Sequence, residues 1–173
     1  MRVSSSVTAR GHPFFWLGLY LFEMKRFDQP EVQAEVYRRL TALTPSSQRW
    51  WGNMTAQQAL CHLVDSLEAV RGDRTMTMPP LPALQRLVMK WGALYLPVPW
   101  PCGIKTAPEN DQQLRGTPPS GFEADRARLL ELAGRLNDGR WVALHPIMGA
   151  MTNLEWQRWA HLHFDYQLRQ FSV

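Results

Sequence analysis

The chain has 173 residues, of which 45% are hydrophobic and 20% are charged, and its formal net charge is +4. This length and balance predict one globular domain with its own core, and they argue against a fibrous repeat or a largely disordered chain. The basic residues are scattered rather than clustered, so we expect no nucleic-acid partner. The two cysteines, Cys61 and Cys102, have no paired spacing, which predicts no disulfide and a reducing, cytoplasmic location.

Residues 1–23 form an apolar N-terminal extension. Its apolar run, residues 14–22, is about half the length needed to cross a bilayer, so we expect no membrane partner. No signal-peptide cleavage site follows the run, because charged residues come at once. Met24 then opens a stretch with helix-start signals. Two interpretations stay open: a mis-assigned start with translation from Met24, or an N-terminal segment docked on the domain, which is predicted to span residues 24–173.

Start and stop signals predict four amphipathic helices. The first spans residues 29–43, after Asp28 and with Pro30 in its first turn. Capping boxes, in which a Ser or Thr and the residue three positions later bond each other's main-chain amides, are predicted at Thr55, Ser120 and Thr152. They open helices that end near residues 71, 136 and 171.

Nearly fifty residues separate the second and third of these helices. They contain a short helix-like run, residues 84–96, and a proline-rich stretch, residues 97–119. No segment shows the alternation of a strand, and prolines break residues 98–105 into an extended loop. The predicted fold is therefore all-α, a four-helix bundle with a long crossover between helices two and three.

The last helix carries polar residues on its apolar face. Wound at about 100° per residue, it places His163 and Gln167 among Trp, Phe and Tyr side chains. An unsatisfied buried polar group costs about 1–3 kcal/mol, so the core, a metal or a substrate must supply partners. His161 and Asp165 fall on the other side of the helix, where we expect solvated ion pairing rather than a ligand role.

The second helix offers a partner for these residues. His62 lies at the border of its apolar face, with Ser66 one turn later. A single histidine at such a border is more often a structural hydrogen-bonding residue than a ligand. Two histidines on different helices that flank a bundle core favour a site, because bundle sites are built from inward-facing side chains.

Several strings resemble the DinB-like superfamily, in a branch without an assigned activity, from about Met24 to the end of the chain. They are Trp51-Gly52-Asn53-Met54-Thr55, Cys61-His62-Leu63, Thr106-Ala107-Pro108-Glu109, His145-Pro146 and the ending from His163 to Leu168-Arg169-Gln170-Phe171. The resemblance implies a four-helix bundle, commonly a homodimer, that holds a divalent metal, often nickel or zinc. Some members of the superfamily are thiol-dependent transferases or isomerases.

Carried over by position, the resemblance makes His62 the ligand from the second helix and His163 the first ligand from the last. Gln167 stands where the family usually has another histidine. An amide oxygen is a weaker ligand for nickel or zinc than imidazole, so a His-His-Gln site should bind metal less tightly. His145, before Pro146, is an additional candidate ligand or a loop-packing residue.

Two classes of function follow. The first is a metal-assisted enzyme that acts on a small molecule, which the resemblance implies to be thiol-linked, with a degenerate His62, His163 and Gln167 site. The second is a metal-free bundle that binds a ligand or forms a structural dimer without catalysis. Gln167 favours the second class, and the resemblance favours the first.

Overall fold

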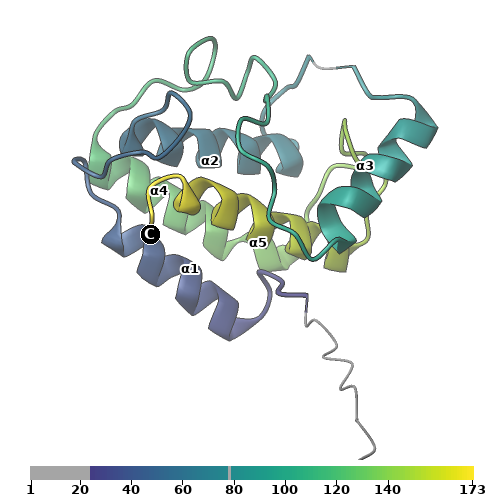
Figure 1. The fold of residues 1–173 in the computed structure, drawn as a ribbon, viewed down its shortest axis with the longest axis horizontal. Helices are drawn as coiled ribbons and strands as arrows, with labels where there is room; N and C mark the ends of the chain where they lie inside the picture. The colour runs from purple at the N-terminus through teal and green to yellow at the C-terminus, as the bar shows by residue number, and fades with distance from the viewer. Residues whose placement is uncertain (1–23, 78) are drawn as a thin grey trace, which may run out of the picture.

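The computed structural model describes residues 24–77 and 79–173, and the predicted N-terminal extension, residues 1–23, lies outside them. The described residues form helices and connecting loops without a named strand, which confirms the all-α prediction (Figure 1). No helix among them is both long and apolar enough to span a membrane. In chain order the elements are α1 (Pro30–Ala42), α2 (Ala56–Arg71), α3 (Ala83–Tyr95), α4 (Phe122–Gly134), the 3-10 helix η1 (Leu136–Asp138) and α5 (Asn153–Arg169).

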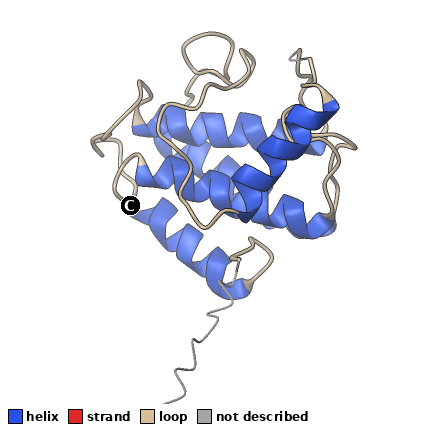
Figure 2. Cartoon of the chain, turned by 45° about the vertical axis from the view of Figure 1, so that its right-hand side comes forward, coloured by secondary structure: helices blue, strands red, loops and turns tan. Residues whose placement is uncertain are grey.

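The helices pack into a bundle around one apolar core (Figures 1 and 2). α2 lies against both α4 and α5, while α1 and α3 each lie against α5. The largest fully buried side chains come from all five α-helices and the segments beside them, including Trp156, Phe164, Leu60 and Leu129. Phe27, just before α1, stacks on Phe164 with ring centroids 5.1 Å apart. This burial of apolar surface is the main stabilising contribution to the fold.

Two of the three predicted capping boxes are confirmed. Thr55 accepts from the Gln58 amide, and the Gln58 side chain accepts from the Thr55 amide, at the start of α2. Thr152 and Glu155 make the same reciprocal pair at the start of α5. Each pair satisfies two amides that have no partner within their helix, which fixes where the helix begins.

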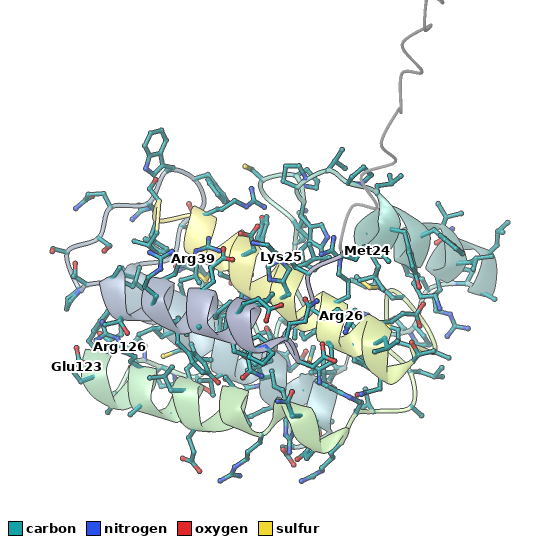
Figure 3. The ribbon with its side chains drawn as sticks, turned by 90° about the horizontal axis from the view of Figure 1, so that it is seen from below. Met24, Lys25, Arg26, Arg39, Glu123 and Arg126 are labelled. Carbon is teal, nitrogen blue, oxygen red and sulfur yellow. The ribbon has the colours of Figure 1, made fainter. Side chains whose placement is uncertain are left out.

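The predicted box at Ser120 is wrong. α4 begins at Phe122, and its N-cap is Gly121, which makes no side-chain cap. Asp125 is the acceptor before this helix instead. Its carboxylate accepts from the Ser120 amide at 3.1 Å and from the Ser120 hydroxyl at 2.6 Å. Glu123, the expected partner, lies on the surface with Arg126 (Figure 3). Asp125, and not Glu123, therefore satisfies these donors at the start of α4.

α1 also begins differently from the prediction. Its N-cap is Gln29, without a side-chain cap, and the helix starts at Pro30, which needs no amide partner. Asp28 accepts from the Arg26 guanidinium at 3.0 Å rather than from the helix amides. The predicted range, residues 29–43, still agrees with Pro30–Ala42 to within one residue at each end.

The expectation of a solvated side for α5 is wrong at His161. Its side chain is 7% exposed, because α1 covers that side of α5. Arg39 of α1 donates to Asp165 at 2.9 Å and to the main-chain carbonyl of Val173, and Arg169 also pairs with Asp165. The ion pairs expected of Asp165 are present, but they lie at a helix contact. A single-helix projection cannot show that a second helix packs on its polar side.

The connection between α2 and α4 is fixed to the bundle by a buried carboxylate. Asp65 of α2 is fully buried and accepts from the Thr117 amide at 2.8 Å and from Gln112 at 2.9 Å. Arg74 pairs with Asp65 at 2.9 Å and donates to the carbonyl of Glu109. These contacts hold residues 109–117 against α2, and this position brings the chain over His62.

Candidate functional site

The site is built around two histidines from different helices. His62 of α2 is 4% exposed, and His163 of α5 is partly exposed on the facing side. Their Nε2 atoms lie 3.2 Å apart, within hydrogen-bond distance. The border position of His62 and the inner position of His163, both deduced from helical spacing, therefore meet in space.

The connection sets the protonation of this pair. The Nδ1 atom of His62 lies 2.8 Å from the main-chain carbonyl of Asn110. A carbonyl only accepts, so Nδ1 of His62 carries the proton and Nε2 keeps its lone pair. Nε2–H of His163 then donates to Nε2 of His62. The carbonyl of Asn110 therefore fixes the direction of this hydrogen bond, with His163 as the donor and His62 as the acceptor.

Both rings are neutral near pH 7. Burial holds the pKa of His62 below its ordinary value, although the hydrogen bond to Asn110 opposes this shift. Burial also lowers the pKa of His163 well below its ordinary value, and the neighbouring His62 lowers it further. Neutral imidazole is the form that accepts hydrogen bonds and binds metals.

Gln167 lies one turn after His163 and lines the same pocket. Its side chain is 4% exposed, and its Oε1 atom has no hydrogen-bond partner among the described residues. Asn110 Oδ1 and His163 Nδ1 also lack partners there. Gln167 and Asn110 both line the pocket, and each has an unpaired acceptor oxygen that is itself buried. Such oxygens suit a ligand that donates hydrogen bonds or carries positive charge.

His145 lines the pocket, but its lone pair is in use. Nδ1 of His145 accepts from the amides of Ile147 at 3.1 Å and Met148 at 3.2 Å. Burial lowers the pKa of His145 to about 4, so the ring is neutral and Nε2 carries its proton. This tautomer gives His145 a donor rather than a free lone pair. The geometry suits the loop-packing role better than the metal-ligand role.

The histidine pair opens on a large, mainly apolar pocket of about 1010 Å³ between α2, α3, α5 and the connection. Trp159 packs edge-on against His163, with ring centroids 4.9 Å apart, and Trp100 lies 6.2 Å from the same ring. The hydroxyl of Tyr166 accepts from the amides of Gly103 and Ile104, which holds the connecting loop beside the pocket.

The donor set has a partial fit to a divalent metal. Two nitrogens that bind one tetrahedral zinc at about 2.0–2.1 Å are about 3.3 Å apart, close to the 3.2 Å between the histidines. The carbonyl of Asn110 orients His62 as a second-shell partner does, and Gln167 has a free oxygen. No cluster of three or more His, Cys, Asp and Glu residues suited to a metal occurs within residues 24–77 and 79–173. The fit therefore rests on two imidazoles and one amide.

Other features of the pocket were not identified from the sequence. Asn110 directly follows the Thr106–Glu109 string, and this adjacency in sequence could have indicated that it lies near the site. Its contact with His62 depends on how the connection folds. Trp100 and Tyr166 belong to no motif. Cys61, beside His62 in sequence, does not line the pocket and lies instead near Asp125 of α4; burial and Asp125 raise the pKa of its thiol to about 12.

Comparison with family models, curated proteins and solved structures finds no match to this chain.

Proposed function

We propose that this chain is a small-molecule-binding protein of DinB-like architecture, a four-helix bundle with a crossover, whose ligand lies over the His62–His163 pair. The observation that carries the proposal is a pocket of about 1010 Å³ that is lined by two neutral imidazoles, the buried His62 and the partly exposed His163. The ligand class is a mainly apolar molecule with a donor or cationic group. Its apolar part would contact the tryptophans, and its polar end would satisfy the free oxygens of Asn110 and Gln167.

Filling the pocket mouth tests this proposal. Gly92 of α3 lines the pocket and has open space where a side chain would begin, so Gly92→Trp adds a large ring without a steric clash at its base. Gly134 of α4 has the same open space and does not line the pocket, so Gly134→Trp is a matched control.

The probe is N-phenyl-1-naphthylamine, an apolar dye with one N–H donor, and its binding is followed by energy transfer from the tryptophans of the pocket. We expect saturable binding to the full chain, a loss of at least about tenfold in affinity in Gly92→Trp, and no change in Gly134→Trp. Equal affinity in all three proteins would show that the dye binds outside the pocket, and the proposal would then lose its support.

A second candidate function is metal-assisted chemistry at the same pair, favoured by two imidazole Nε2 atoms 3.2 Å apart in the pocket that Gln167 also lines. His62, His163 and Gln167 would hold nickel or zinc. When bound, such an ion lowers the pKa of a coordinated water or thiol and polarises a substrate. His62 is already oriented for this role by Asn110.

Isothermal titration of untagged protein with nickel or zinc tests the second candidate. We expect weak binding to the wild type that is lost in His163→Ala. Binding that survives this substitution would place the metal elsewhere on the chain. Homodimer formation and a cytoplasmic location remain predictions from the resemblance and the cysteines.

A further inference from the structure

Exposed apolar side chains gather on one part of the molecule. Eight of the thirteen exposed large hydrophobic residues in the described chain lie between residues 84 and 104. We refer to them as the α3 patch. They are Leu84, Leu87, Val88, Met89, Trp91, Leu96, Val98 and Ile104. Single exposed apolar residues are ordinary, but such a concentration marks an interaction surface.

The helix carries a core-like stripe that the bundle covers only at one end. Leu84, Leu87, Trp91 and Leu94 follow the spacing of an apolar helix face. Leu94 is buried against the bundle at 1% exposure, whereas Leu84 is 73% exposed and Trp91 is 56% exposed. In Figures 1 and 2, α3 projects from the other helices. Its first two turns therefore present the stripe to a partner outside the bundle.

The charged residues within the segment that forms the patch are all basic. Residues 75–107 contain Arg86, Lys90 and Lys105 and no Asp or Glu. Lys90 pairs with Glu155 of α5, which partly neutralises it. Trp91 stacks near Tyr95, with ring centroids 4.4 Å apart. Exposed leucines and a tryptophan, flanked by Arg86 and Lys105, are the composition of a helix that lies in the interface of an anionic bilayer.

The N-terminal part of the chain joins the described structure near this patch. Arg158 donates from Nη1 to the carbonyl of Lys25 at 2.9 Å and from Nε to the carbonyl of Leu94 at 3.4 Å. Met24 accordingly lies on the side of the bundle that carries α3 (Figure 3). The apolar run of residues 14–22, which lies outside the described residues, immediately precedes this point in sequence.

We propose that the α3 patch docks on an anionic lipid surface. This departs from the expectation of no membrane partner, and it does not rest on the proposed ligand or metal. A second copy of the chain fits less well, because a two-fold contact would bring the cations of one patch against those of the other. Residues 14–22 fit less well as the occupant of the α3 patch. This run is apolar throughout its sequence, so packing on the patch would leave part of its own apolar surface in water. A lipid surface could bury the patch and the run together.

Docking in this way has a consequence for the pocket. Val88, Met89, Val98 and Ile104 belong to the α3 patch and also line the pocket. The pocket mouth would therefore face the lipid surface. An apolar molecule could pass between the bilayer and the pocket without crossing water.

The chain contains its own labelling site for the test. Cys102 is exposed in the loop of the α3 patch, and the other cysteine, Cys61, is buried. An environment-sensitive fluorophore on Cys102 of the full chain should shift to shorter wavelength with phosphatidylcholine vesicles that contain phosphatidylglycerol. Phosphatidylcholine alone should give a weaker shift, and added salt should reduce the response to the mixed vesicles.

A matched pair of variants identifies the surface. Leu84→Gln/Leu87→Gln removes two exposed leucines that do not line the pocket, without a change of charge. Ala124→Gln/Ala127→Gln makes the same kind of change on the exposed side of α4. We expect the first variant to lose at least about tenfold in partitioning to mixed vesicles, and the second to partition like the wild type.

Three results would overturn the proposal. The first is no wavelength shift and no co-flotation with the mixed vesicles. The second is an equal loss of partitioning in both double variants. The third is a dimer in sedimentation that dissociates only in Leu84→Gln/Leu87→Gln, which would assign the patch to a second copy. Unchanged thermal unfolding of both variants is the check that each is folded.

Discussion

Substituting Gln167 by histidine tests whether the pocket residues converge on one point. Gln167 is 4% exposed, and its Oε1 has no partner in the described structure, so the substitution removes no hydrogen bond made by that oxygen. We expect Gln167→His to create a three-imidazole site with His62 and His163, with an affinity for nickel or zinc that is orders of magnitude above that of the wild type.

The size of the effect follows from linkage. Metal at about one hundred times its dissociation constant stabilises the folded state by about 2.7 kcal/mol if it binds only that state. For a domain of this size, that corresponds to a rise of about 5–10 °C in Tm. Differential scanning calorimetry with and without nickel or zinc measures it. The wild type should gain much less at the same metal concentration.

Two controls make the result specific. His163→Ala in the Gln167→His background should remove the metal-dependent gain. Gln167→Met, which has similar volume and no donor atom, should unfold at or above the wild-type temperature without metal, because the unpaired oxygen is gone. If Gln167→His gains nothing from metal, then the three side chains do not converge and the proposed ligand set is wrong.

Further predictions concern stability. Asp125→Ala should lower the free energy of unfolding in urea by about 2–3 kcal/mol, because Asp125 accepts from the donors at the start of α4. Glu123→Ala should lower it by less than about 0.5 kcal/mol. Equal losses in the two variants would contradict this description of the cap. Burial lowers the pKa of His161 to about 4, against about 6.5 when unfolded, so the unfolded chain binds more protons between these values and stability falls as pH drops through them. His161→Met should therefore lose about 2 kcal/mol less than the wild type between pH 7 and pH 4.5, and parallel pH profiles would refute this. Gly52→Ala should cost more than about 1 kcal/mol in the same assay, because Gly52 has a φ of +74° and an added Cβ would lie 2.5 Å from Nε2 of Gln170; an unchanged midpoint would show that the loop relaxes freely.

The helices were predictable because their signals are local. The Thr55 and Thr152 boxes each involve residues three apart, and no distant element competes for them. At Ser120 the same pattern failed because Asp125, two positions beyond the expected partner, bonds the Ser120 amide and hydroxyl instead. A capping pattern cannot show which of two nearby carboxylates accepts.

The candidate site was predictable only in part. Helical spacing places His163 on the inner face of its helix and His62 at the border of one, and their 3.2 Å contact agrees with that placement. The contact of Asn110 with His62, the burial of His161 under α1 and the projection of α3 all depend on the packing of distant segments. No periodicity within one helix contains that information.

The bond from the Asn110 carbonyl to His62 has a consequence for how this site tolerates sequence change. Every amino acid has the same main-chain carbonyl, so replacing the side chain at position 110 leaves the acceptor for His62 in place. An insertion or deletion in residues 107–117 would instead move that carbonyl relative to the Asp65 anchor. In diverging sequences, the length of this turn should therefore be under stronger selection than the identity of residue 110.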